Sequence, residues 1–171
     1  EDNANNDDAE FLKFRENLFE ILNDKSITLN EKSQKFSSFF EFDFPEFSKD
    51  ELVDLFISLE RLDDYWSVML NQLKETDISD VEIPEKFNRY FENLIKYFTY
   101  RHFTIMDDYD MMFFILTSYR MIENLCKMHI KNYIYLTLED VVEYCRLYSS
   151  EIEYSDENID KIIEMLYKNE P

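Results

Sequence analysis

The sequence predicts an all-α fold, an antiparallel helical bundle of the four-helix type with short accessory helices. Three observations lead to this prediction. Apolar residues recur every three and four positions through several long segments, which is the period of an amphipathic helix. Residues typical of helix starts precede these segments. The 171-residue chain contains no glycine, whereas tight β-hairpin turns commonly need glycine at positive φ.

The amino-terminal quarter predicts a leader and two helices. Residues 1–8 contain no apolar anchor and are expected to form a disordered leader, so that a single domain spans 9–169. An apolar stripe predicts the first helix at about 9–23, and a second, shorter one follows at about 31–42, capped by Asn30. Proline in the segment FDFPEF then interrupts the helical pattern, because it disfavours helical angles in the residue before it.

The best-patterned segment begins at a capping box, in which the Ser48 hydroxyl and the Glu51 carboxylate each satisfy a free backbone donor. Large apolar residues then alternate by three and four over three heptads. This spacing predicts one continuous helix over about 49–75. Its stripe consists of Leu52, Leu55, Leu59, Leu62, Trp66, Met69 and Leu73.

Four further helices are predicted in the carboxy-terminal half. The first begins after Pro84, which suits a first helical turn, and its stripe runs from Phe87 to Ile105. The other three span about 109–131, 138–149 and 156–168, preceded by helix-starting residues at Asp107 and Asp108, at Thr137 and at Ser155.

The net charge of −20, from 38 acidic and 18 basic residues, restricts the partners of the chain. A field of this sign repels nucleic acid and attracts basic proteins or cations, so nucleic-acid binding is excluded. Residues 86–131 are the exception, with seven basic and five acidic residues. They form either a central hairpin covered by acidic helices or a partly exposed, cationic and aromatic face. The longest apolar run, Met111 to Tyr119, is too short to span a bilayer.

Familiar catalytic patterns are missing from the sequence. Without glycine there is no phosphate-binding loop, dinucleotide fingerprint or nucleophile elbow, and no Glu-x-x-His pair is present. The acidic cluster of Asp107, Asp108 and Asp110 and the segment EIEYSDENID both lack the spacing of a calcium-binding EF-hand. The prediction is therefore a protein that is not an enzyme, with no cofactor, no metal and no small-molecule substrate.

Two cysteines lie at equal distances from the predicted turn at 132–137. In an antiparallel hairpin, Cys126 and Cys145 face each other and are candidates for a disulfide in an oxidising compartment. The alternative is a pair of buried thiols. A zinc site that adds His129 is a third, weaker hypothesis, because only three soft ligands are present. His102 is interpreted as a residue of the helix seam.

Aromatic residues are abundant, with 16 Phe, 12 Tyr and one Trp. Exposed Phe and Tyr side chains anchor many protein interfaces. The alternative is a Phe-rich core that reflects AT-biased codons. The candidates for an interaction surface flank the proline interruption or lie off the main stripe of the helix after Pro84: Phe42, Phe44, Phe47, Tyr97, Tyr100 and Phe103.

The chain makes frequent use of Asn, Lys, Phe, Tyr and Ile, and it has the acidic start EDNANNDD and the tail YSDENIDKIIEMLYKNEP. In these features it resembles secreted helical-bundle proteins of malaria parasites. In size and pattern the chain is similar to the sporozoite microneme protein for cell traversal (SPECT). The segments FSKDELVDLFISL and VEIPEKFNRYFENLI also resemble the PHIST domain of exported proteins, although that family carries several tryptophans and here Trp66 stands alone. The resemblance implies a secreted factor that helps sporozoites pass through host cells.

These observations together predict a secreted, non-enzymatic interaction protein that acts on a protein partner or a host membrane. Its location would be a microneme or another secretory organelle, as the resemblance implies. The alternative is an acidic inhibitor or immunity protein that binds a basic partner, with association steered by the net charge.

Overall fold

The computed structural model describes residues 2–38, 47–102 and 106–168, and within them the side chains of 2–11, 29, 30, 33 and 37 lie outside the description. The described residues form eight α-helices and no strand, so the all-α prediction is confirmed. None of the described helices is long and apolar enough to cross a membrane.

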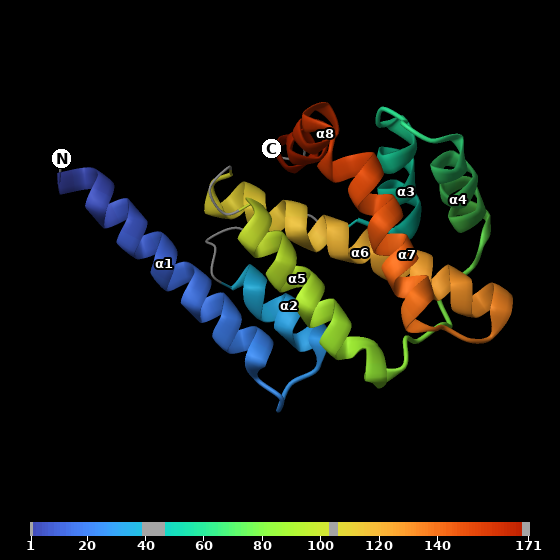
Figure 1. Ribbon diagram of the computed structural model, residues 1–171, viewed down its shortest axis with the longest axis horizontal. Helices are drawn as coiled ribbons and strands as arrows, with labels where there is room; N and C mark the ends of the chain where they lie inside the picture. Colours follow the sequence, from blue (N-terminus) through green and yellow to red (C-terminus); the bar gives the residue numbers. More distant parts are fainter. Residues whose placement is uncertain (1, 39–46, 103–105, 169–171) are drawn as a thin grey trace.

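The chain starts with a helical hairpin at one side of the molecule (Figure 1). Helix α1 spans Asp2–Asn23 and α2 spans Leu29–Ser37, where Thr28 rather than Asn30 is the N-cap. Helix α1 thus begins before the predicted start, within the stretch expected to be a leader. The division into a leader at 1–8 and one domain at 9–169 stays a prediction.

The central element is α6 (Asp108–Tyr133), which runs through the middle of the fold (Figure 1). It contacts five other helices: α3 (Lys49–Ser58), α4 (Asp64–Glu75), α5 (Asn88–His102), α7 (Leu138–Tyr148) and α8 (Asp156–Tyr167). Fifteen of its residues are buried, on all of its faces, and a helix that is apolar all round is typical of such a central position. Asp107 caps its start, and Ile134 ends it in a left-handed conformation with φ 69°.

Helices α5, α7 and α8 pack against α6, and their observed bounds lie close to the predicted ones. Helix α5 (Asn88–His102) follows a short 3₁₀ turn, η1 (Glu85–Phe87), that begins after Pro84. Helix α7 (Leu138–Tyr148) continues into a π-helical turn, η2 (Ser149–Glu153), and α8 (Asp156–Tyr167) completes the fold.

The predicted single helix over 49–75 is wrong. Two helices occupy this stretch, α3 (Lys49–Ser58) and α4 (Asp64–Glu75), with the connection at Leu59 extended. The buried Asn158 side chain accepts from the Glu60 backbone N–H at 2.8 Å and donates to the Glu60 carbonyl at 3.0 Å. Glu151 accepts from the Leu62 N–H at 2.9 Å. Contacts from the far end of the chain therefore satisfy backbone groups that a continuous helix would pair internally.

Candidate functional site

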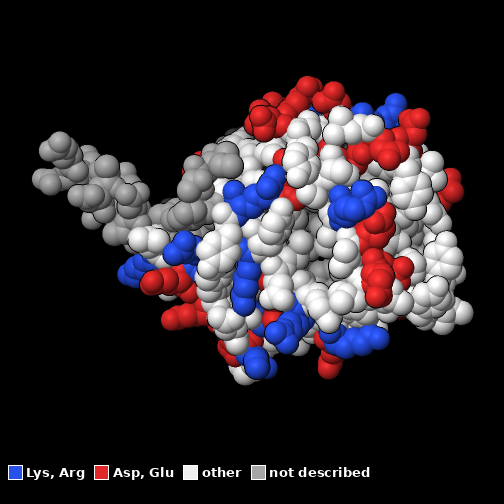
Figure 2. Space-filling model, in the orientation of Figure 1, with Lys and Arg blue, Asp and Glu red and all other residues white. Residues whose placement is uncertain are grey.

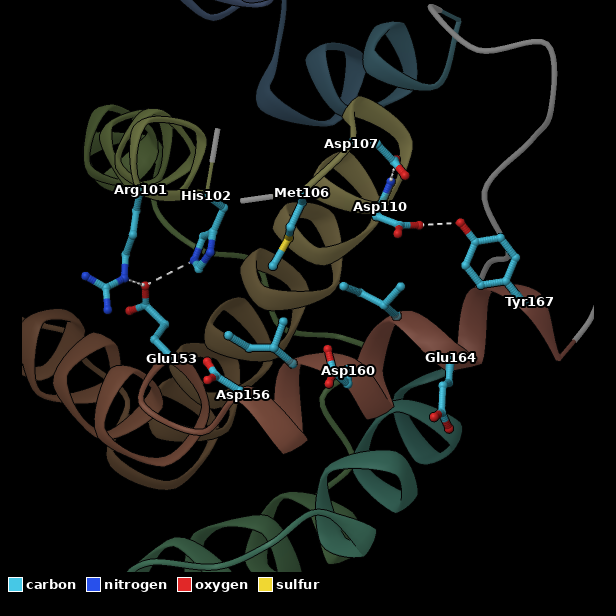
Figure 3. A pocket seen from close by; sticks show the side chains of 12 residues that line it. Arg101, His102, Met106, Asp107, Asp110, Glu153, Asp156, Asp160, Glu164 and Tyr167 are labelled. Atoms are coloured by element: carbon cyan, nitrogen blue, oxygen red, sulfur yellow. Dashed lines mark hydrogen bonds and ion pairs between the residues drawn. The ribbon is translucent and has the colours of Figure 1, made fainter. Parts of the chain in front are cut away.

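An acidic pocket lies between the end of α5, the start of α6 and one face of α8 (Figure 3). Its volume is about 920 Å³, within the usual range of small-molecule and side-chain binding sites. The lining residues come from these three helices and from η2: Arg101, His102, Met106, Asp107, Asp110, Glu153, Asp156, Ile159, Asp160, Ile163, Glu164 and Tyr167.

One wall of the pocket is formed by α8. Asp156, Asp160 and Glu164 are spaced four residues apart, so the helical repeat places them in a row with a rise of about 6 Å between neighbours. Ile159 and Ile163 lie between them and give the same wall an apolar component. The wall thus offers carboxylates at intervals along a partly apolar surface, and all three acidic residues are exposed.

The opposite wall is the start of α6. Asp107 caps the helix by accepting hydrogen bonds from the backbone N–H groups of Tyr109 and Asp110, at 3.1 and 3.0 Å. Asp110 accepts a hydrogen bond from the hydroxyl of Tyr167 on α8 (Figure 3). Burial and the neighbouring charge of Asp107 raise the pKa of Asp110 above its usual value. Burial is the larger of these two causes, because it penalises the ionised form of the carboxyl group.

The end of the pocket beside α5 holds a buried ionic group (Figure 3). Glu153 Oε1 lies 2.8 Å from Arg101 Nε and 3.4 Å from His102 Nε2. The contact with Arg101 is an ion pair, and neither contact has the geometry of a hydrogen bond. His102 is only 3% exposed, packs edge-on against Phe114 at 4.8 Å and has no hydrogen-bond partner at either ring nitrogen. Buried polar atoms without a hydrogen-bond partner are rare in native proteins, so the His102 ring is an unusual feature of this end of the pocket.

The charge balance of the pocket favours a cationic ligand. Its lining contains six carboxylates (Asp107, Asp110, Glu153, Asp156, Asp160 and Glu164) and one guanidinium, that of Arg101. A cleft lined by one sign of charge concentrates ions of the opposite sign. In the described part of the chain, no three His, Cys, Asp or Glu side chains converge closely enough to hold a metal ion. The carboxylates and the side chains of Ile159 and Ile163 in the same lining suit an organic cation with an apolar stem.

The stability contribution of Glu153 is expected to depend on pH. Burial alone would raise the pKa of Glu153, but the side chains of His102, Ser149 and Arg101 outweigh it, so the pKa lies below the usual value. The ionised carboxylate therefore stabilises the fold above about pH 5, and this contribution is lost as the pH falls through the lowered pKa. Urea unfolding should show Glu153→Gln less stable than the wild type at pH 7, with the difference shrinking toward pH 3. The exposed Glu75→Gln is the control, and a difference of constant size for Glu153→Gln would contradict this prediction.

Of the predicted interaction aromatics, Tyr97 contacts a residue of this pocket, since its hydroxyl donates to Glu153 Oε2 at 3.5 Å. Tyr97 and Tyr100 are exposed on α5, by 45% and 60%. Phe47 is half-buried and packs edge-on against Phe113 at 6.0 Å, so it contributes to the core. Phe42, Phe44 and Phe103 lie outside the described residues. An interaction role for Tyr97 and Tyr100 stays a prediction.

Both cysteines are free thiols in this structure, with Cys126 buried and Cys145 half-buried. Burial raises the pKa of both thiols, that of Cys145 to about 11. The disulfide between them stays a prediction. His129 Nδ1 lies 2.9 Å from the Tyr144 hydroxyl, so the partner of this ring nitrogen is a side chain of α7.

Comparison with known proteins gives one match. No curated protein and no solved structure matches the chain. The model of the FliB lysine N-methylase C-terminal domain matches residues 3–171, which is nearly the whole sequence.

This match corrects four predictions. The resemblance to malaria-parasite proteins, SPECT and PHIST alike, is wrong, because it was based on amino-acid vocabulary and not on matched positions. The match along residues 3–171 also overturns the predicted secreted traversal factor with its microneme location. It likewise overturns the alternative of an acidic inhibitor, which was based on the net charge. The prediction that the protein is not an enzyme is also contradicted, since the family that matches is named for a lysine N-methylase. The chain belongs to the family of FliB lysine N-methylase C-terminal domains.

Proposed function

We propose that the acidic pocket binds the side chain of a lysine in a protein substrate, and that this domain serves substrate recognition for a lysine N-methylase. The observation that carries the proposal is the composition of the pocket. Six carboxylates and one guanidinium line this cavity, and at its end beside α5 the buried His102 ring lies 3.4 Å from Glu153.

A lysine side chain matches both features of the α8 wall. Its ammonium group has three hydrogen-bond donors and no acceptor, and carboxylates such as Asp156 and Asp160 are strong acceptors for it. Its four-carbon stem is apolar and needs contact with surfaces such as Ile159 and Ile163. The alternation of acids and isoleucines along one helix face supplies both kinds of contact.

Titration calorimetry of the purified chain with a short peptide tests this proposal. The peptide carries one central lysine in an otherwise neutral sequence, and a second peptide has alanine in its place. We expect binding of the lysine peptide only. Asp156→Asn/Asp160→Asn should weaken it about tenfold or more, because each lost charge contact is worth about 1 kcal/mol.

The matched control is Glu157→Gln, a charge removed from the same first turn of α8, where Glu157 pairs with Lys161 outside the pocket. This variant should bind the lysine peptide as the wild type does. Equal affinity for the lysine and alanine peptides would overturn the proposal, as would equal losses in the pocket variant and in Glu157→Gln.

A further inference from the structure

One face of α5, which α1 borders through Phe19 and Arg15 at Tyr100, has a charge opposite to that of the rest of the protein. Its residues that are not buried between 89 and 101 include three cations and three tyrosines, and the one acid of the helix, Glu92, pairs with the buried Lys32. Figure 2 shows Lys and Arg side chains along α5 and acidic side chains gathered over α8. The residues of this face, called here the α5 face, are Arg89, Tyr90, Asn93, Lys96, Tyr97, Tyr100 and Arg101.

The cations of the α5 face are only partly used within the described part of the chain. Lys96 donates a hydrogen bond to the neutral side chain of Asn23 at 2.7 Å, which leaves its charge unbalanced. Arg89 has no ion pair or hydrogen bond with the described residues. In a chain of net charge −20, two cations without acidic partners on one helix face indicate a surface that is complementary to an anionic group.

The α5 face is continuous with the acidic pocket. Arg101 belongs to both, since its guanidinium pairs with Glu153 in the pocket and lies 5.6 Å from the ring of Tyr154. Along the helix axis, Lys96 is about 7.5 Å from Arg101 and Arg89 about 18 Å from it. An extended peptide advances about 3.3 Å per residue, so a segment leaving the pocket crosses this face within about eight residues.

We propose that the α5 face binds an acidic segment that flanks the substrate lysine. This inference rests on the proposed function of the pocket. With the lysine in the pocket, carboxylates about three to eight residues away along the peptide pair with Lys96 and Arg89. The exposed rings of Tyr90 and Tyr97 contact the peptide backbone and apolar side chains, whereas Tyr100 packs against Phe19 of α1 at 5.1 Å. The substrate is therefore a lysine with acidic residues on one side of it.

The net charge of the chain predicts opposite effects on binding for acidic and basic peptide flanks. Long-range electrostatics at net charge −20 disfavour any peptide that gains negative charge. If an acidic flank improves binding, the gain must come from local cations that outweigh this repulsion. A basic flank, in contrast, should improve binding through the overall field alone.

The test is fluorescence anisotropy with labelled 15-residue peptides and the purified chain. One peptide has a lysine with a neutral flank, and two have the same lysine with three Asp or Glu residues at positions three to eight, on either side of it. We expect one acidic flank to raise the affinity about fivefold to tenfold. Arg89→Gln/Lys96→Gln should abolish this gain and leave the affinity for the neutral-flank peptide unchanged.

The control is Lys131→Gln, which removes an exposed cation at the end of α6 that is far from the pocket. This variant should still bind the acidic-flank peptide more tightly than the neutral-flank peptide. If the neutral-flank peptide binds but no acidic flank improves it, the inference about the α5 face fails and the pocket proposal stands. If no lysine peptide binds, the pocket proposal itself fails. Equal binding of an acidic peptide with alanine for lysine, or tighter binding of a single-stranded oligonucleotide that depends on Arg89 and Lys96, would also overturn the inference.

Discussion

The Phe98→Ala variant is expected to unfold with a free energy about 3–5 kcal/mol lower than that of the wild type, the usual range for truncating a buried aromatic residue. Phe98 is 1% exposed and joins three elements of the core. Its ring lies 5.9 Å from that of Tyr148 on α7 and 6.3 Å from that of Phe114 on α6. The surrounding helices are fixed by many other contacts, so they close only part of the cavity. Urea denaturation followed by circular dichroism at pH 7 measures the loss.

The neighbouring Tyr97→Ala is the control for this prediction. Tyr97 lies on the same helix but is 45% exposed, so we expect a loss below about 1 kcal/mol. Phe98→Leu should fall between the two, because leucine refills most of the volume. A loss for Phe98→Ala no greater than that for Tyr97→Ala would show that the α5–α6–α7 contact does not hold the core together.

The helices of the carboxy-terminal half could be predicted because their starts depend on local chemistry. Asp107, Thr137 and Ser155 each accept a hydrogen bond from a backbone N–H in the next turn, and the observed starts lie within one residue of those expected. The period of the apolar stripes then determines the length of each helix. Such information is contained in segments of a few residues, so the sequence alone reveals it.

The break between α3 and α4 depends on residues almost 100 positions away and could not be predicted in this way. The apolar repeat continues through the break, because Leu59 and Trp66 are both buried in the same core. What interrupts the helix is the pairing of the Glu60 backbone with Asn158. Periodicity reports which face is buried and is insensitive to a change of chain direction between two segments that share that face.

The acidic pocket was visible in the sequence only in part. Asp156, Asp160 and Glu164 share one face of a helix that we predicted correctly, and their spacing with Ile159 and Ile163 was the available signal. Residues 151–160, which include Asp156 and Asp160, lack the spacing of a calcium-binding EF-hand, and that pattern does not predict a pocket of this kind. The approach of Arg101 and His102 from α5 depends on tertiary packing. Membership of the methylase family depends on matched positions along residues 3–171, which composition does not measure.

The contact between Lys32 and Glu92 is expected to fix the α1–α2 hairpin to the rest of the fold. Lys32 is buried, donates to the Leu22 carbonyl at 2.8 Å and forms an ion pair with Glu92 on α5. Removing one partner of a buried ion pair leaves the other charge without compensation. Glu92→Leu should therefore lower the free energy of unfolding by about 3 kcal/mol, the lower end of the range for such pairs, since Glu92 is only half-buried.

The double variant Lys32→Met/Glu92→Leu separates a charge effect from a packing effect. It replaces both charges by apolar groups of similar length, so we expect stability within about 1 kcal/mol of the wild type. Hydrogen exchange of α2 should accelerate in Glu92→Leu and return to the wild-type rate in the double variant. If the two variants lose equal stability, the pair acts through the packing of its methylene groups. In that case the ammonium of Lys32 needs no carboxylate beyond its bond to Leu22.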